Sequence, residues 1–186
     1  MSAKQLLIFA AFVALWIAWF MPFLLKRRGG GTKPEVRASA SRWGMLLQAI
    51  AFGVGSFHYA TWDTFTSPRV VASLIFETVA VVLAWTSVRA LGKQWRLEAA
   101  LSADHELVQK GPYSIVRHPI YTSMFCIFLA LALMLSSWWT AVIGAVIFFI
   151  GTEIRVQAEE RLLAGRFGAS FDSYRKHVPA YVPGVR

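Results

Sequence analysis

Four long apolar segments, at residues 5–25, 43–62, 70–88 and 118–152, constrain this chain of 186 residues more than any other feature. The first and the last contain no Asp, Glu, Lys or Arg, and each segment reaches the roughly 20 residues that a helix needs to cross a bilayer. With 56% hydrophobic residues, the chain is also too apolar for an ordinary soluble domain. The sequence therefore predicts an all-α, polytopic integral membrane protein.

The segment 118–152 is too long for a single span. As one helix it would run about 52 Å, well beyond the hydrocarbon thickness of roughly 30 Å. The run Ser136-Ser137-Trp138-Trp139 offers a turn, because serine satisfies tight turns and tryptophan prefers the membrane interface. We therefore expect five transmembrane helices, with the fourth and the fifth joined near these residues.

Lysine and arginine gather in three segments, 26–42, 89–117 and 155–186, which five spans would place on the same side of the membrane. Only Lys4 and Arg69 lie on the other side. The positive-inside rule makes the basic side cytoplasmic, so we expect the amino terminus outside and the carboxyl terminus inside. Topology and attraction to anionic lipids explain the net charge of +9, and we predict no nucleic-acid partner.

We expect the chain to divide near residue 90. Residues 1–90 would form three transmembrane helices with a cytoplasmic linker at 26–42, in which Gly29-Gly30-Gly31 favours flexibility. Residues 91–186 would form a second unit with the last two spans and the polar segments around them.

Several residues inside the predicted spans stand out. Gly53 and Gly55 are small enough to let helices approach closely. The ionisable side chains of His58 and Glu77 are expected near the outer end, hydrogen-bonded or reaching the interface, with a functional role as the alternative. Cys126 is the only cysteine, so the chain has no intrachain disulfide.

The stretch 105–121 is the longest polar segment between apolar runs, and it carries two histidines, two tyrosines and an arginine. Gly111-Pro112 marks a turn, and Pro119 suits the first turn of the helix that follows. Side chains of this kind at the mouth of an apolar helix indicate a small-molecule site.

Beyond the fifth span the helical pattern continues, with Arg155 and Glu159 four residues apart on one face. Further on, Phe167, Phe171 and Tyr174 form an apolar stripe among basic residues. This pattern is typical of a helix that lies on the membrane surface, so we expect an interfacial carboxyl-terminal helix.

The motifs between residues 91 and 181 resemble those of the isoprenylcysteine carboxyl methyltransferase family and, more loosely, those of the phospholipid N-methyltransferases. The matching pieces are His105-Glu-Leu-Val108, Gly111-Pro-Tyr113, Arg117-His-Pro-Ile-Tyr121, Arg155, Glu159-Glu160-Arg-Leu-Leu, Phe167-Gly168, Tyr174 and Val178-Pro179. They cover about half of the chain in one consistent order. The first two spans carry no such signature.

The resemblance implies an integral membrane methyltransferase that uses S-adenosyl-L-methionine and releases S-adenosyl-L-homocysteine. It assigns Arg155 and Glu159 to catalysis, with Arg155 facing the methyl acceptor. By position, the residues that would hold the cofactor are His105, Glu106, Leu107, Val108, Tyr113, His118, Pro119, Ile120, Tyr121 and Glu159. Ser123 stands where the family often has glycine, and Glu98 stands where a family glutamine contacts the cofactor.

The residue types leave the acceptor open. A carboxylate is already ionised at neutral pH, needs no general base and suits a bidentate pair with Arg155. A phospholipid amine or a small thiol would first have to lose a proton. We expect carboxyl O-methylation of an isoprenylcysteine-like or other lipidic acceptor that arrives from the lipid, in a prokaryotic inner membrane, at a site facing the cytoplasm.

Two other classes of protein fit the same apolar pattern. One is a membrane reductase that uses NADPH, and the other is a non-enzymatic membrane scaffold in which the loop residues only cap and anchor helices. We predict no metal site, and the sequence leaves the oligomeric state open.

Overall fold

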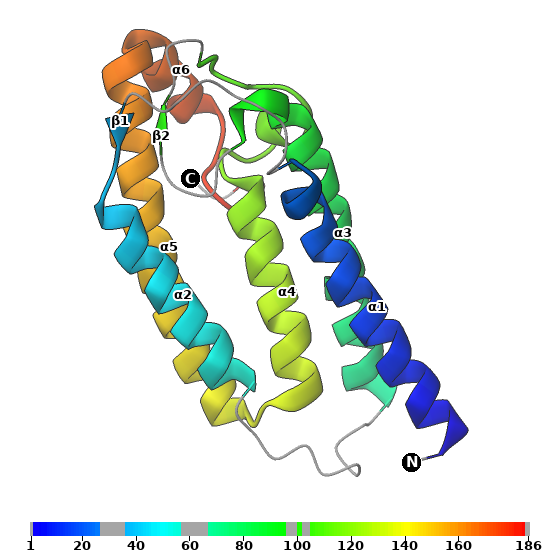
Figure 1. Cartoon of the computed structure of the whole chain (residues 1–186). Coiled ribbons are helices and arrows are strands. Elements are labelled where there is room, and N and C mark those ends of the chain that lie inside the picture. The colour runs from blue at the N-terminus through cyan, green and yellow to red at the C-terminus, as the bar shows by residue number, and fades with distance from the viewer. Residues whose placement is uncertain (1, 27–35, 57–66, 96–99, 102–104, 185–186) are drawn as a thin grey trace.

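The computed structural model describes residues 2–26, 36–56, 67–95, 100–101 and 105–184, and five long helices dominate it (Figure 1). They are α1 (Ala3–Lys26), α2 (Ala40–Ser56), α3 (Ser67–Leu91), α4 (Pro119–Leu135) and α5 (Trp138–Phe167). A sixth helix, α6 (Ala169–His177), follows α5, and two 3-10 turns, η2 (Gly92–Gln94) and η3 (Gly111–Ser114), lie between α3 and α4. Gly168 separates α5 from α6 with φ +50°, a conformation that favours glycine.

The helical fold predicted from the sequence is confirmed, with one addition. The strand β1 (Val36–Arg37) pairs antiparallel with β2 (Ala100–Leu101), so that Val36 lies opposite Leu101. Strands of two residues leave no alternating pattern, so periodicity could not predict them. The pair lies at the end of the bundle where α6 also lies (Figure 1).

Three helices support the membrane character. Within the described residues, Ala3–Lys26, Pro68–Gln94 and Trp138–Phe167 are long and apolar enough to cross a bilayer. The apolar helix Pro119–Leu135 is shorter, and α2 has 17 residues. The count of five spans, the orientation of the termini and the division near residue 90 therefore stay predictions. Most of the predicted linker, His58 and Glu98 lie outside the described residues.

The predicted turn within the segment 118–152 is confirmed. Helix α4 ends at Leu135 and α5 begins at Trp138. Ser137 caps α5, because its Oγ accepts a hydrogen bond of 3.4 Å from the Thr140 amide. Ser136 Oγ donates to the Gly55 carbonyl and so ties the turn to the end of α2.

Apolar packing joins α1, α3 and α4, with α3 in contact with both of the others. The buried members of the two clusters are Phe12, Val70, Leu131 and Met134, and Trp19, Ala80, Ala84 and Ile127. Large apolar side chains also face outward, as Leu7, Val71 and Val142 do with 71%, 55% and 54% of their surface exposed. In a bilayer, lipid would cover this surface. In water, exposing these apolar side chains would cost free energy.

Helices α2 and α5 pack against each other through glycines. A Cβ built on Gly44 would lie 2.5 Å from the Gly151 carbonyl oxygen, and one on Gly151 would lie 2.7 Å from the Gly44 carbonyl oxygen. At the other end of the pair, a Cβ on Gly55 would lie 2.5 Å from the Phe128 ring. The predicted close approach is therefore right for Gly55 and wrong for Gly53, whose Cβ position has no atom within 4 Å. We call the Gly44–Gly151 contact the glycine seam.

Glu77 differs from the expectation of an interfacial or hydrogen-bonded carboxylate. Its side chain is fully buried on α3, one turn from Ser73 and Ala80 on the same face. Neither carboxylate oxygen has a hydrogen-bond partner in the part of the chain that the structure describes. The expected hydrogen bond is therefore not found among the described residues, whereas the expected position near the outer end of a span stays a prediction.

The apolar stripe near the carboxyl terminus also differs from its prediction. Phe171 and Tyr174 on α6 are 1% and 7% exposed, so they pack against the protein instead of lipid. Their rings contact each other, with centroids 6.4 Å apart. The prediction that this stripe faces the membrane surface is wrong for these two side chains. The short helix α6 folds back on α5, which buries its apolar face.

Replacing Gly44 by alanine should destabilise the fold. The added methyl group would clash with the backbone of α5 at Gly151, and overpacking of this kind costs about 1–3 kcal/mol. We expect a lower midpoint of thermal unfolding for Gly44→Ala in detergent. Gly53→Ala is the matched control on the same helix, because its site is open and alanine favours a helix. Equal midpoints for the two variants would contradict the seam.

Candidate active site

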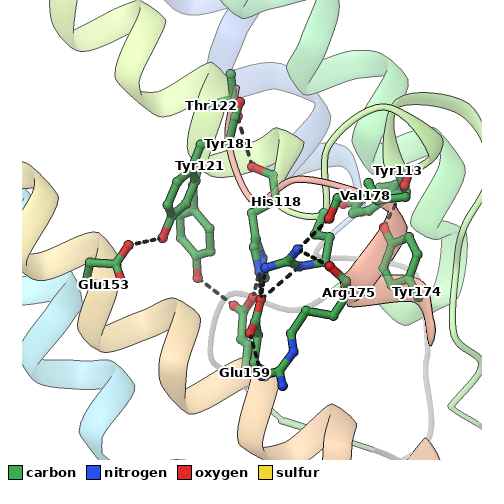
Figure 2. Close-up of polar contacts among 12 residues, drawn as sticks. Tyr113, His118, Tyr121, Thr122, Glu153, Glu159, Tyr174, Arg175, Val178 and Tyr181 are labelled. Atoms are coloured by element: carbon green, nitrogen blue, oxygen red, sulfur yellow. Dashed lines mark hydrogen bonds and ion pairs between the residues drawn. The ribbon is translucent and has the colours of Figure 1, made fainter. Parts of the chain in front are cut away.

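The loop before α4, the second half of α5 and the carboxyl-terminal segment meet in one polar network (Figure 2). Tyr121, in the first turn of α4, donates a hydrogen bond of 2.5 Å from its Oη to Glu159 Oε1. His118 Nδ1 lies 3.6 Å from Glu159 Oε2. These two contacts hold the start of α4 against α5.

The neighbouring Glu160 binds the other nitrogen of the same histidine. His118 Nε2 lies 3.1 Å from Glu160 Oε1. Arg117 Nε donates a hydrogen bond of 3.0 Å to that oxygen, and Arg117 Nη2 forms an ion pair with it at 2.9 Å. Consecutive residues of a helix diverge by about 100° around its axis, so they seldom share a partner. Here the Arg117-His118 dipeptide reaches both glutamates and closes the network.

The charge of this network favours a protonated His118. Burial alone would lower the pKa of His118, but hydrogen bonds and charge from Glu159 and Glu160 raise it above its ordinary value of 6.5. An imidazolium donates from both ring nitrogens, which matches a carboxylate on each side. We infer that the ring is a cation that balances one of the two carboxylates.

Arg155 lies one turn before Glu159 and is 6% exposed. Its Nη1 donates a hydrogen bond of 2.8 Å to Gln48 Oε1 on α2. Its guanidinium carbon lies 5.0 Å from the centre of the Tyr121 ring, within the range of a cation–π contact. The arginine therefore links α2, α4 and α5.

Tyr113, in η3, is held from the carboxyl-terminal side. Tyr174 Oη donates a hydrogen bond of 2.6 Å to the Tyr113 carbonyl oxygen (Figure 2). Burial raises the pKa of Tyr113 above its ordinary range and the pKa of Tyr174 to about 12. Both phenols are therefore neutral at physiological pH and can donate hydrogen bonds.

The segment after α6 folds back onto the same loop. The amides of Arg117 and His118 donate to the carbonyls of Pro179 and Ala180 at 2.8 and 3.0 Å. Thr122 Oγ1 donates to the Tyr181 carbonyl at 3.0 Å, and Tyr181 Oη donates to Glu153 Oε1 at 2.6 Å. The carboxyl-terminal segment thus supports the loop that carries the network.

A cavity of about 400 Å³ lies beside the network. That volume is within the range of small-molecule sites. The loop, α4 and α5 contribute its charged and polar side chains, and α1 contributes apolar ones. The α1 residues are Trp19, Phe20, Phe23 and Leu24.

Most of the predicted site residues line this cavity. Those that do are His105, Glu106, Leu107, Val108, Tyr113, His118, Ile120, Tyr121, Arg155 and Glu159. Pro119 does not, since it is buried in the first turn of α4. Their roles toward a cofactor or an acceptor stay predictions.

Sequence reasoning missed several residues of the site. The α1 aromatics left no signal beyond general apolarity, although Trp19 Nε1 also donates to Ser123 Oγ at 3.2 Å. Arg117 and Glu160 stood within the matching motifs, but neither was assigned to the site. Gln48 had one usable signal, because it is a polar side chain within an otherwise apolar segment.

The sequence is similar to those of several known proteins. Residues 68–170 match a family model described as phospholipid methyltransferase. The chain is 34% identical over 80 residues to protein-S-isoprenylcysteine O-methyltransferase of Schizosaccharomyces pombe, a match that covers 43% of this chain and 34% of that protein. It is 30% identical over 139 residues to protein-S-isoprenylcysteine O-methyltransferase B of Arabidopsis thaliana, covering 75% of this chain and 68% of that protein.

A bacterial relative carries a different kind of name. The chain is 29% identical over 142 residues to the nickel-cobalt-cadmium resistance protein NccN of Alcaligenes xylosoxydans xylosoxydans, covering 76% of this chain and 62% of that protein. The chain therefore spans about a third of the length of the S. pombe relative and less than two thirds of the length of NccN. Within the described residues, no group of three or more His, Cys, Asp or Glu side chains is placed to hold a metal ion.

Replacing His118 by glutamine should destabilise the fold in a pH-dependent way. The pKa of His118 is raised in the folded state, so the stabilisation is fully present below its ordinary value and is lost as the pH rises through the raised one. We expect the gap in unfolding midpoint between wild type and His118→Gln to be largest below the ordinary pKa of 6.5 and to narrow as the pH rises above it. His177→Gln is the control, because His177 is exposed. A difference in midpoint between wild type and His118→Gln that does not change with pH would contradict an imidazolium at His118.

Proposed function

Because the chain belongs to the phospholipid methyltransferase family, we propose that it is an integral membrane methyltransferase that uses S-adenosyl-L-methionine. The proposed reaction is carboxyl O-methylation of an isoprenylcysteine-like or other lipidic acceptor. The observation that carries the proposal is one cavity lined both by His118, Arg155 and Glu159 and by the apolar side chains of α1. A polar cofactor and an apolar acceptor need these two kinds of surface side by side.

The donor groups of the polar wall fit the cofactor. When bound, S-adenosyl-L-methionine supplies a methyl group on a sulfonium, which a carboxylate oxygen takes in one in-line displacement that moves no proton. The Glu159 carboxylate suits an ammonium or ribose hydroxyls, and Tyr113 and His105 offer further hydrogen-bonding groups at the cavity wall. His118 and Tyr121 would act through Glu159, since both hold its oxygens. Such a site contributes mainly alignment and the exclusion of water.

The acceptor would contact Arg155 and the α1 wall. A guanidinium binds a carboxylate through two parallel hydrogen bonds, and Arg155 lies at the cavity wall beside Glu159. The aromatic side chains of Trp19, Phe20 and Phe23 offer an apolar surface for a hydrocarbon chain. An acceptor with a carboxylate head and an apolar tail satisfies both surfaces at once.

The finer placement in the cell is also part of the proposal. We place the basic segments and the site at the cytoplasmic side of a prokaryotic inner membrane, with five spans. The ends of α1 and α3, the start of α4 and the second half of α5 lie at the same end of the bundle, as that topology requires (Figure 1). A soluble cofactor can then enter from the cytoplasm and a lipidic acceptor from the bilayer.

Two measurements test the function. Thermal-shift titration with S-adenosyl-L-homocysteine should raise the unfolding midpoint, whereas NADPH should leave it unchanged. Incubation with methyl-labelled cofactor should label an S-prenylcysteine that has a free carboxylate, and not its methyl ester. Stabilisation by NADPH would support a reductase, and labelling of a phospholipid amine or a thiol would replace the carboxylate acceptor. No stabilisation by either ligand would support a scaffold.

Replacing Glu159 by glutamine should weaken cofactor binding. The amide still accepts the Tyr121 hydrogen bond, so the fold should survive, but it lacks the charge that attracts an ammonium. We expect the dissociation constant of S-adenosyl-L-homocysteine, measured by calorimetry, to rise about tenfold to a hundredfold. Glu153→Gln is the control on the same helix, because Glu153 contacts Tyr181 and does not line the cavity. Unchanged affinity in Glu159→Gln would remove the assignment.

Replacing Arg155 by lysine should separate turnover from cofactor binding. Lysine keeps the positive charge but cannot form two parallel hydrogen bonds with a carboxylate. We expect turnover of a prenylcysteine carboxylate to fall roughly tenfold or more, with cofactor affinity near the wild-type value. Turnover of Arg155→Lys near the wild-type value would overturn the role given to Arg155. Weaker cofactor binding with unchanged turnover at saturating cofactor would also overturn it.

A further inference from the structure

A buried glutamine on α2 holds the arginine of the cavity wall. Gln48 is 2% exposed and lies outside the residues 68–170 that match the family model. Its amide oxygen accepts the hydrogen bond of 2.8 Å from Arg155 Nη1. The part of the chain that carries no family motif therefore reaches the proposed site.

The orientation of the Gln48 amide is fixed at its other end. Gln48 Nε2 donates a hydrogen bond of 2.8 Å to Thr152 Oγ1, which is buried on α5 one turn before Arg155. With its nitrogen bound to Thr152, the amide can present only its oxygen to the arginine. Thr152, Gln48 and Arg155 thus form a chain of two hydrogen bonds with one possible direction.

The glycine seam brings this chain together. A Cβ on Gly44, one turn before Gln48, would lie 2.5 Å from Arg155 Cγ as well as 2.5 Å from the Gly151 carbonyl oxygen. The absence of a side chain at Gly44 therefore leaves room for the arginine stem. The guanidinium then lies between Gln48 on one side and the Tyr121 ring on the other, with its carbon 5.0 Å from the ring centre.

We infer that Gln48 is a positioning residue that holds the Arg155 guanidinium at the cavity wall for an anionic group of the methyl acceptor. The inference rests on the proposed function only in that Arg155 meets the acceptor. A glutamine suits this task because it fixes the arginine by a hydrogen bond and adds no negative charge. A glutamate at the same place would pair with the guanidinium and compete with the acceptor carboxylate.

The test measures a preference between two matched ligands. An S-prenylcysteine with a free carboxylate and its methyl ester share the apolar tail and differ in the charge that Arg155 would bind. Quenching of tryptophan fluorescence can report their affinities, because Trp19 and Trp95 line the cavity. A purely structural defect would weaken both ligands equally and leave the ratio of their dissociation constants unchanged.

We expect wild type to prefer the acid over the ester and Arg155→Met to lose that preference. Gln48→Met should reduce the preference about tenfold, and Gln48→Glu should abolish it, while the affinity for S-adenosyl-L-homocysteine stays within about twofold. Thr152→Val should reduce the preference and Thr152→Ser should restore it, which keeps the test valid if the Gln48 variants fail to fold. Ser41→Ala is the control, since Ser41 is a buried polar residue of α2 whose Oγ has no hydrogen-bond partner among the described residues.

The outcomes separate the two claims. A full acid preference in Gln48→Met and in Thr152→Val, with its loss in Arg155→Met, would overturn the positioning role and leave the proposed function standing. No acid preference in wild type would overturn the proposed role of Arg155 and, with it, the inference about Gln48.

Discussion

The rest of the site depends on the contacts of Arg117 and His118 with the adjacent carboxylates Glu159 and Glu160. His118 is 6% exposed and lies between the two glutamates, at 3.6 Å from one and 3.1 Å from the other. Charged groups removed from water are stable only when partners satisfy them, and the loss of one partner leaves the others uncompensated. The same dipeptide also binds the carboxyl-terminal segment through its backbone amides. One compact network therefore fixes the loop, α4, α5 and the chain end at once.

The two halves of the chain contribute different surfaces to the cavity. The motif-bearing half supplies the charged wall, while α1 supplies aromatic side chains and α2 supplies the glutamine that holds Arg155. The glycine seam lets α2 lie directly on α5, because a Cβ at Gly44 would lie 2.5 Å from the Gly151 carbonyl oxygen. The amino-terminal helices are thus part of the site, although their sequences carry no motif.

The sequence predicted the parts of the structure that follow from repeated local patterns. Apolar segments of sufficient length gave the helices, and the serine and tryptophan run gave the turn between α4 and α5. Prediction failed where a long-range contact decides the outcome. The burial of Phe171 depends on α6 folding back, the burial of Glu77 on the packing around α3, and the role of Gln48 on a neighbour 107 residues away. A single sequence does not record which distant residues are in contact. For Gln48, the only indication was a polar residue within an apolar segment.

The length of α5 relates the charged groups to the depth of the membrane. A helix that starts at one boundary of the hydrocarbon reaches the other after about 20 residues, or about 30 Å. Counted from Trp138, which carries a ring suited to the interface, Arg155 lies about 26 Å along the axis and Glu159 about 32 Å. In the proposed topology, this count would put Arg155 near the edge of the hydrocarbon and Glu159 just beyond it. If the proposed function holds, a lipidic carboxylate would meet the arginine without leaving the bilayer, and the polar cofactor would stay on the aqueous side of the same helix.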